Sequence, residues 1–373
     1  MQYQNQVFDF FVGSDFHLEQ FSNQYMVNGQ VDYQILDRIL SNIIRPKSKY
    51  RNVTRKPICI IAGDVTRITP FYVNSNLTIP TDQIYKYFLE WVSKRFQKVI
   101  VIAGNHEYYS EVVSGKPKNM IEIKQQIRDW TKEYPKVVFL DDEVLVIDQI
   151  AIWGGTLWSL LPDSCRLALP IYVEDKMITT QQYNDLHKKS LASLIEAKYK
   201  YGDKTFVVVS HHAPTFQHFL PEYLTTSRRF LYATDLHHVM QDELVEYWIA
   251  GHTHQSTTLT INKTQFISNS GPEKVEYNPE FVLIINNGNS DKKFLFRIFK
   301  AVCSEQIPLI FTFDKKNVRK YIHDLECLKS SCEILLSRQV FGQREMLIEK
   351  QRECEGIIAQ FQHYSNISFY SED

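Results

Sequence analysis

Five short apolar runs each end in polar side chains of the kinds that bind metal ions, and this arrangement constrains the chain more than any other feature. The runs cover residues 7–12, 58–62, 99–103, 206–209 and 247–250. Such runs are typical of buried strands, and ligands in open α/β sheets collect at the carboxyl ends of the strands. The residues that follow the runs are Asp15 and His17, Asp64, Asn105 and His106, His211, and His252 and His254. We therefore expect one polar site at the edge of a sheet.

The chemistry of these side chains predicts the metals. The candidate ligands are Asp15, His17, Asp64, Asn105, His211, His252 and His254. Imidazole and carboxylate ligands without thiolate suit Mn, Fe, Zn or Co better than Ca or Mg. Seven side chains are more ligands than one ion can bind while it keeps a coordination position free for water or substrate. The sequence therefore predicts two divalent ions, Mn or Fe/Zn, with Asp64 as the residue that could bridge them.

Two ions about 3.5–4 Å apart can clamp the attacking and leaving oxygens of an in-line displacement at phosphorus, and they lower the pKa of a bound water. A further group must meet the leaving oxygen. His106 is the natural candidate because it follows Asn105 directly. Either Glu107 or Asp142 could orient His106, and the sequence does not separate these two alternatives.

Four further residues are weaker candidates for substrate binding. Arg228 and Arg229 stand side by side on a loop and could grip phosphate oxygens, although a solvated basic pair is the simpler interpretation. Arg67 follows Asp64 closely. His212 is adjacent to His211 and is the alternative ligand if the register is displaced by one residue.

Composition excludes several classes of protein. The 373-residue chain carries a net charge of −1, so its overall charge makes nucleic acid and anionic membranes unlikely partners. No apolar run approaches the roughly 20 residues that a membrane span requires. The first eleven residues lack a secretory signal. The six cysteines form no Cys-x-x-Cys pair and predict free thiols in a reducing compartment, which favours a cytoplasmic protein.

Alternating strand and helix patterns predict a layered α/β domain with a strand-rich second half. Helices are expected over 31–44, 82–96 with Thr81 as N-cap, 121–130, 180–199 and 234–244. Residues 66–81 are expected to form a loop. The segments 137–140, 144–147 and 150–153 predict an antiparallel meander, 257–261 and 265–268 a hairpin, and 281–285 and 294–299 two more strands.

The last part of the chain has a different composition. Residues 314–362 contain many helix formers and two apolar stripes, one on Leu325, Leu328, Cys332, Leu335 and Leu336, the other on Leu347, Cys354, Ile357, Ile358 and Phe361. This pattern predicts a helical hairpin or one long bent helix over 308–373, appended to a domain over 1–300. The stripes could pack back on that domain or form a contact with a second subunit or another partner.

The motifs Asp15-x-His17, Gly63-Asp64, Gly104-Asn105-His106-Glu107, His211 and Gly251-His252-x-His254 resemble, together and in this order, those of the calcineurin-like metallophosphoesterase superfamily. The resemblance implies a four-layer αββα sandwich of two mixed β-sheets flanked by helices. It implies one ion on Asp15, His17, Asp64 and His254, and a second on Asp64, Asn105, His211 and His252. It also assigns the general-acid role to His106.

Two departures narrow the subclass. Arg67 stands one residue earlier than in the protein Ser/Thr phosphatases of this superfamily, and His17 is followed by Leu18 rather than by Gly. The chain looks more like the broad bacterial-type phosphoesterases of unassigned substrate.

The sequence thus predicts a phosphoesterase in which a metal-bound hydroxide attacks a phosphate ester in line, with His106 as general acid. Phosphomonoester or protein phosphatase activity is slightly favoured over phosphodiesterase activity, and the expected partner is a phosphorylated small molecule or protein. Two alternatives stay open. One is a nuclease on the same fold. The other is a non-catalytic scaffold that binds partners through the helical tail.

Overall fold

The structure is a computed structural model. It describes residues 7–45, 57–74, 77–111, 116–163, 165, 167–219, 224, 226–241, 244–272, 277–286, 325, 328–337 and 344–368. The chain divides into two compact units. One consists of Met1–Tyr201, Thr205–Met240 and Val245–Gly288, and the other of Gly202–Lys204, Gln241–Leu244 and Asn289–Asp373. The domain boundaries predicted at 1–300 and 308–373 stay a prediction.

The first sheet has the strand order β17-β1-β4-β7-β8. Its strands are β1 (Val7–Gly13), β4 (Ile58–Ile61), β7 (Lys98–Val101), β8 (Val137–Phe139) and β17 (Val282–Asn286). The strands β1, β4, β7 and β8 run parallel, whereas β17 pairs antiparallel with β1. The predicted strands that lead to Asp15, Asp64 and Asn105 are therefore adjacent and end at the same edge.

The second sheet has the order β15-β16-β14-β13-β10-β9. It contains β9 (Glu143–Ile147), β10 (Ile150–Gly155), β13 (Thr205–Ser210), β14 (Val245–Ala250), β15 (Thr257–Ile261) and β16 (Thr264–Ser268). The central strands β10, β13, β14 and β16 are parallel, and the outer strands are antiparallel. Both sheets are therefore mixed, as predicted.

Three apolar clusters separate four layers. Alternate residues of the two sheets, such as Phe10 and Ile60 from the first and Ile152 and Val207 from the second, share one cluster between the sheets. The residues in between, such as Phe11, pack outward against helices. This alternation follows from the two-residue period of a strand. It confirms the predicted αββα sandwich.

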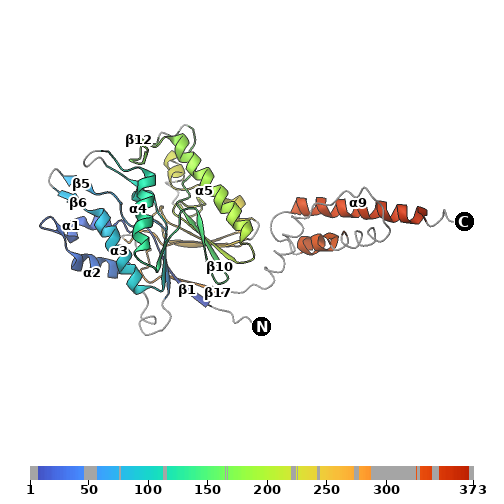
Figure 1. Ribbon diagram of the computed structural model, residues 1–373, viewed down its shortest axis with the longest axis horizontal. Coiled ribbons are helices and arrows are strands. Elements are labelled where there is room, and N and C mark those ends of the chain that lie inside the picture. Colours follow the sequence, from blue (N-terminus) through green and yellow to red (C-terminus); the bar gives the residue numbers. More distant parts are fainter. Residues whose placement is uncertain are drawn as a thin grey trace. The chain divides into compact units, whose positions relative to one another are not determined.

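Helices cover the two outer faces of this sandwich. On the first sheet lie α2 (Tyr33–Ile43), α3 (Thr81–Arg95) and α4 (Met120–Lys132), and on the second lies α5 (Thr180–Lys200) (Figure 1). Capping residues set the starts of several helices: Asp32 accepts from two backbone N–H groups of α2, and Asn119 and Thr179 form capping boxes for α4 and α5. The minor elements are the helix α1 (Ser22–Tyr25), the strand pairs β2–β3 (Met26–Val27, Gln30–Val31) and β11–β12 (Tyr172–Val173, Lys176–Met177), and the 3-10 helices η1 (Leu18–Phe21), η3 (His106–Tyr108), η4 (Ser227–Leu231) and η5 (His237–Met240).

The predicted loop over 66–81 was wrong in part, because β5 (Phe71–Asn74) and β6 (Leu77–Ile79) form a hairpin there. Two of the prolines that suggested a loop, Pro70 and Pro80, stand directly before β5 and directly after β6. Thr81 is not the N-cap of α3 either. It is the first helical residue, and its hydroxyl donates to the backbone oxygen of Thr69.

The predicted meander over 137–153 was also wrong in its first step. The strand β8 pairs parallel with β7 in the first sheet, whereas β9 and β10 form an antiparallel hairpin in the second. The chain thus changes sheets between β8 and β9. The helix expected over 234–244 is reduced to the 3-10 helix η5. The strand expected over 294–299 lies outside the described residues.

The C-terminal unit contains a helical segment, as predicted. Residues 328–337 are helical, and α9 (Arg344–Ser368) follows. Lys329 and Glu355 form an ion pair of 3.3 Å. Two residues 26 positions apart would be about 39 Å apart in one straight helix, so the chain folds back into a hairpin. Buried residues of both predicted stripes include Leu328, Cys332 and Cys354.

Among the described residues, no helix has both the length and the apolar character that crossing a membrane requires.

Replacing Ile152 by alanine should lower the free energy of unfolding by about 2–5 kcal/mol, because Ile152 is fully buried between the two sheets. Val146→Ala on the neighbouring strand is the matched control, because Val146 is 41% exposed, and its change should stay below about 1 kcal/mol. Urea unfolding of both variants measures the difference. Equal losses would contradict the position of the interlayer core.

Candidate metal centre

The carboxyl ends of five parallel strands meet at one edge and deliver the predicted residues. Backbone hydrogen bonds join the segments just beyond the strands: Asp15 N donates to Gly63 O at 3.0 Å, and Gly251 N donates to His211 O at 3.0 Å. These bonds join neighbouring segments within each sheet, and the bond from His252 N to Asp15 Oδ1 at 2.9 Å joins the two sheets where the polar residues begin. The segments that follow the predicted strands therefore lie at one shared edge, as the sequence predicts.

Five of the seven candidate ligands have a left-handed backbone. The φ angles are 56° for Asp15, 43° for His17, 54° for Asp64, 67° for His252 and 53° for His254. Residues other than glycine rarely adopt this region, and such positions cluster at functional sites. The turn at each residue points its side chain toward the shared edge instead of continuing the strand. The strain is a local cost that the surrounding hydrogen bonds offset.

Three glycines of the motifs provide room for these turns. A Cβ atom on Gly63 would lie 2.7 Å from His211 Nδ1, and one on Gly251 would lie 2.7 Å from Asp15 Oδ2. Gly104 has the same function, because its Cβ would collide with the Asp64 carboxylate. Any larger residue at these positions would displace a candidate ligand.

One group of side chains consists of Asp15, His17 and His254. The two imidazole Nε2 atoms are 3.0 Å apart, and Asp15 Oδ1 lies 3.6 Å from His254 Nε2. Asp15 is held by the hydroxyl of Ser14 at 2.5 Å and by the backbone N–H of His252 at 2.9 Å. The group therefore presents two imidazoles and one carboxylate to one point.

A second group consists of Asp64, His211 and His252, with Asn105 beside it. His211 Nδ1 donates to Ala62 O at 2.8 Å, and His252 Nε2 donates to Leu231 O at 3.1 Å. The remaining ring nitrogens, His211 Nε2 and His252 Nδ1, then face each other at 3.2 Å. Asn105 places its Oδ1 2.9 Å from His211 Nε2, while its amide nitrogen donates to the Tyr109 hydroxyl. Hydrogen bonds of this kind fix which atom of a ligand is available to a metal.

Asp64 lies between the two groups. Its Oδ2 is 3.7 Å from His17 Nε2 and 3.3 Å from His211 Nε2. This oxygen is buried and has no hydrogen-bond partner among the described residues, whereas Oδ1 accepts from the backbone N–H of His106 at 2.8 Å. A buried carboxylate oxygen without a partner is costly unless a cation is near it. The arrangement fits a pair of metal ions that share Asp64.

The electrostatics of the site favour positive charge. Burial acts to lower the pKa of His17, but the hydrogen bond to Glu19 and the charges of Asp64, Glu19 and Asp15 raise it to about 9. Burial likewise opposes protonation of His211, and its two interactions with Asp64 raise the pKa to about 9. The buried carboxylates therefore stabilise a cation at each of these two imidazoles, which is the property that a metal site needs.

His106 lies beside the first group, with its ring 4.3 Å from that of His17 and 4.6 Å from that of Tyr109. Among the described residues, the carboxylate hydrogen-bonded to the His106 ring is Glu19, whose Oε1 is 3.0 Å from His106 Nδ1. The expectation that Glu107 or Asp142 orients this ring was therefore wrong. Sequence reasoning missed Glu19; the signal was a carboxylate only two residues beyond His17.

Glu107 has a different function. Its buried carboxylate accepts three backbone N–H groups, from Asp64, Val65 and Gly104, at 2.8–3.0 Å. Burial and the charge of Asp64 raise its pKa to about 8. Glu107 thus joins the loop of Gly63-Asp64 to the loop of Gly104-Asn105. Asp142 lies elsewhere: its Oδ1 is beside Gly155, 2.5 Å from where a Cβ of that residue would be.

The four weaker candidates lie in different places. His212 is buried, 3.1 Å from the Tyr183 hydroxyl, and belongs to neither group of candidate ligands. Arg229 donates to Leu224 O and stacks on Phe230. Arg228 is exposed on η4. Arg67 pairs with Glu111 at 2.6 Å and lies 5.7 Å from the centre of the Tyr109 ring, which places it on the same side as His106.

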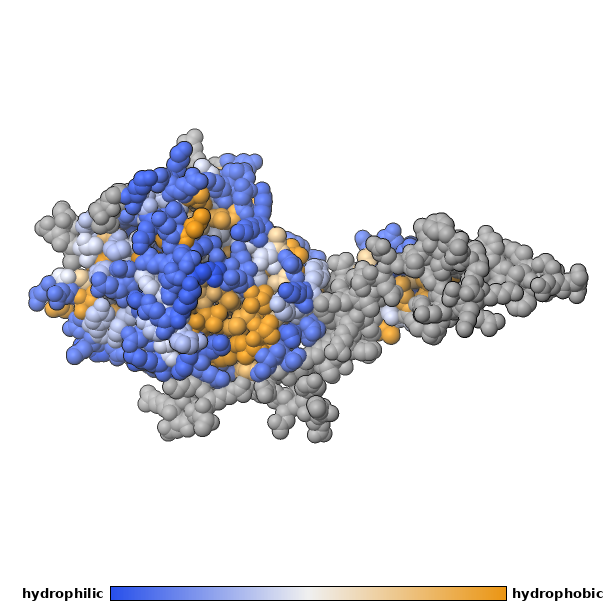
Figure 2. Space-filling model, in the orientation of Figure 1, coloured by the Kyte–Doolittle hydropathy of each residue, from blue (hydrophilic) through white to orange (hydrophobic). Residues whose placement is uncertain are grey.

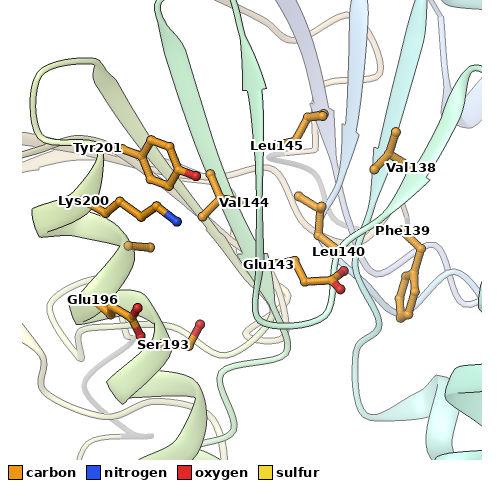
Figure 3. A pocket seen from close by; sticks show the side chains of 11 residues that line it. Val138, Phe139, Leu140, Glu143, Val144, Leu145, Ser193, Glu196, Lys200 and Tyr201 are labelled. Carbon is orange, nitrogen blue, oxygen red and sulfur yellow. The ribbon is translucent and has the colours of Figure 1, made fainter.

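A hollow of about 500 Å³ lies elsewhere, between residues of β8, β9 and the C-terminal half of α5, and includes Leu140, Val144, Glu196 and Tyr201 (Figure 3). Apolar residues also gather in one area of the face seen in Figure 2. The hollow contains none of the candidate ligands, so it is separate from the metal centre.

A comparison with protein families identifies the class of this protein. Residues 9–256 match the profile of the family described as calcineurin-like phosphoesterase. The chain belongs to this family. It is accordingly a metal-dependent phosphoester hydrolase.

Two individual proteins illustrate how far the similarity extends. An uncharacterised protein of Acanthamoeba polyphaga mimivirus is 24% identical over 222 residues, which cover 54% of this chain and 78% of that protein. The crystal structure of phosphopantetheinyl hydrolase from Mycobacterium tuberculosis is 17% identical with a TM-score of 0.43, over 70% of this chain and 88% of that one.

Replacing Gly104 by alanine should weaken metal binding by at least about 10-fold, because the new methyl group would displace the Asp64 carboxylate. Gly356→Ala is the control, since a Cβ there meets nothing within 4 Å. Isothermal titration of Mn²⁺ into both chelator-treated variants measures the affinity. Unchanged binding by Gly104→Ala would show that the Asp64 side chain does not hold the metal.

Proposed function

We propose that the chain hydrolyses phosphate esters with two divalent ions that share Asp64, and that His106 protonates the leaving oxygen. One ion would be held by Asp15, His17, Asp64 and His254, and the other by Asp64, Asn105, His211 and His252. The observation that carries this proposal is the buried Asp64 Oδ2, which has no hydrogen bond among the described residues and lies between His17 and His211. When bound, the ions would supply a water of lowered pKa and neutralise phosphate oxygens.

His106 fits the acid role by position. Its side chain is 25% exposed, whereas the side chains of His17 and Asp64 are at most 5% exposed. Its backbone N–H donates to Asp64 Oδ1, so the ring is held next to the proposed bridge. The Nδ1 atom is occupied by Glu19, which leaves Nε2 for the substrate. As the P–O bond breaks, the Nε2 proton would move to the leaving oxygen.

Phosphomonoester or protein phosphatase activity is slightly favoured over phosphodiesterase activity. A monoester dianion has more charge to neutralise, and the edge offers two cation positions. Arg228, exposed on η4, is the first candidate for phosphate contact, because Leu231 O of the same element accepts from His252 Nε2. Arg67 is the second candidate for phosphate contact, on the side of Tyr109. The metals would be Mn or Fe/Zn by the ligand chemistry, and contact with a second copy or a partner through residues 308–373 belongs to the same proposal.

Asp64→Asn should weaken binding of both ions by more than about 100-fold. Replacing a residue that only hydrogen-bonds to a metal ligand typically costs about 10–100-fold in affinity, and replacing the ligand itself should cost more. His254→Gln should weaken one of two Mn²⁺ sites and leave the other close to wild type. The control is Asp175→Asn, whose carboxylate is exposed and pairs with Lys116. Mn²⁺ stoichiometry after dialysis distinguishes these cases. If Asp64→Asn lost only one of the two ions, the shared carboxylate would be refuted.

His106→Ala should lower kcat by about 10²–10⁴-fold with both metals retained, because general-acid assistance is lost. His238→Ala, an exposed histidine on η5, serves as the control. Activity is measured in the presence of Mn²⁺ with phenyl phosphate, on which this loss is expected because its leaving oxygen is basic, and with p-nitrophenyl phosphate and bis-p-nitrophenyl phosphate, on which the loss should be smaller. Wild-type turnover by His106→Ala would eliminate the acid role, and no turnover of any of these esters by the wild type would favour the scaffold alternative.

A further inference from the structure

We propose that Glu19 is a positioning residue that orients both His17 and His106 through a single carboxylate oxygen. The proposal rests on the function proposed above, in which His17 binds an ion and His106 donates a proton. It goes further because it names a residue outside the five motifs. It also connects one metal ligand directly to the proton donor.

The geometry of this trio carries the inference. Glu19 Oε1 lies 3.2 Å from His17 Nδ1 and 3.0 Å from His106 Nδ1. The two rings meet edge to face, with their centres 4.3 Å apart. Because a carboxylate oxygen accepts, both Nδ1 atoms donate, and both Nε2 atoms are left for other tasks. The Nε2 atom of His17 points to His254 Nε2 at 3.0 Å, which is the side of the first ion.

The backbone fixes Glu19 where these two bonds can form. His17 turns with φ 43° and precedes the 3-10 helix η1, in whose first turn Glu19 lies. His17 N donates to Asp64 O at 3.1 Å, and Leu18 N donates to Val65 O at 2.9 Å. The side chains of Phe16 and Leu18 are fully buried on either side of His17. Glu19 is therefore attached to the loop that carries Asp64.

Glu19 is a buried charge, and the hydrogen bonds described for its carboxylate go only to these imidazoles. It is 7% exposed, and its Oε2 has no hydrogen-bond partner among the described residues. A buried carboxylate needs paired donors, and removing them leaves an uncompensated charge. The two histidines supply these donors, so the carboxylate and both rings are expected to hold one another in place.

During ester hydrolysis, Glu19 would hold the proton donor His106 and the metal ligand His17 in their orientations. His106 begins with a proton on each nitrogen. As the oxygen of the attacking water bonds to phosphorus and the P–O bond to the leaving group breaks, the Nε2 proton moves to the leaving oxygen. The Nδ1 proton stays on His106 and remains hydrogen-bonded to Glu19 Oε1. The next proton comes from water. A carboxylate behind an imidazole holds its orientation and stabilises its charged form. The same carboxylate orients His17 as a metal ligand, an effect typically worth about 10–100-fold in affinity.

The trio could instead bind a third ion, since Glu19, His17 and His106 place three potential ligand atoms within 4.8 Å. The N···O distances of 3.0 and 3.2 Å are those of hydrogen bonds, and one carboxylate oxygen can accept from both Nδ1 atoms without a cation between them. We therefore favour the hydrogen-bonded arrangement. Metal stoichiometry distinguishes the two.

The test uses Glu19→Ala, which removes both bonds, and Glu19→Gln, which preserves side-chain volume and provides a variant if the alanine chain does not fold. Gln20→Ala, an exposed neighbour on η1, is the control. Turnover of phenyl phosphate and p-nitrophenyl phosphate is compared at saturating Mn²⁺. The first ester has the more basic leaving group and depends more on the acid. Mn²⁺ affinity is measured separately by calorimetry, and circular dichroism checks the fold.

Both Glu19 variants should lose Mn²⁺ affinity by about 10–100-fold with two ions still bound. Glu19→Ala should lose about 10²-fold in kcat on phenyl phosphate and much less on p-nitrophenyl phosphate. Glu19→Gln should lose less than Glu19→Ala. In the double variant with His106→Ala, the two losses in kcat should not add, because both changes remove one function.

If Glu19→Ala lost the same factor in kcat on both esters and kept wild-type Mn²⁺ affinity, Glu19 would have only a structural role. If the wild type bound three Mn²⁺ ions and Glu19→Ala bound two, Glu19 would be a metal ligand and the proposal would be wrong. Failure of the proposed acid role of His106 would give a different result. If His106→Ala itself kept wild-type turnover of phenyl phosphate, His106 would not be the acid, while the Mn²⁺ titration would still test the contact with His17.

Discussion

The rest of the site depends on the position of the Asp64 carboxylate. One of its oxygens is fixed by the backbone N–H of His106, and the other lies between His17 and His211 without a hydrogen bond among the described residues. Bringing a carboxylate into this buried position is unfavourable unless positive charge accompanies it. The two groups of imidazoles that surround it can recruit that charge. The proposed two-ion centre follows from this single electrostatic requirement.

The fold meets that requirement through its backbone. Parallel strands from both sheets end at the same edge, and the chain then turns through left-handed residues at Asp15, Asp64 and His252. Glycines beside these turns leave no room for larger residues. Glu107 joins the loops by accepting three backbone N–H groups. The layered core makes this edge rigid, so strained residues can be maintained there.

Much of this arrangement could be predicted from the sequence because it depends on local patterns. Apolar runs identified the strands to Asp15, Asp64 and Asn105, and the residues after them identified the site. The errors have a physical cause. Pairing between β7 and β8 depends on contacts distant in sequence, so a parallel partner was mistaken for a meander. Similarly, two short strands, β5 and β6, are stabilised by each other and do not show a strong period.

Glu19 could not be assigned from sequence for a related reason. Its contact with His106 joins positions 87 residues apart, and its spacing from His17 alone does not show which way the side chain points. Glu107 was adjacent to His106 in sequence and seemed the nearer partner, yet its carboxylate turns to the backbone of Asp64 and Gly104. Proximity along the chain was thus a poor guide to the side-chain contacts of His106.

The most direct test of the central claim is anomalous diffraction from crystals of the Mn²⁺-loaded protein. The account predicts two metal peaks about 3.5–4 Å apart on either side of the Asp64 carboxylate. One should be next to His17 and His254, and the other next to His211 and His252. A single peak, or two peaks that do not share Asp64, would contradict it.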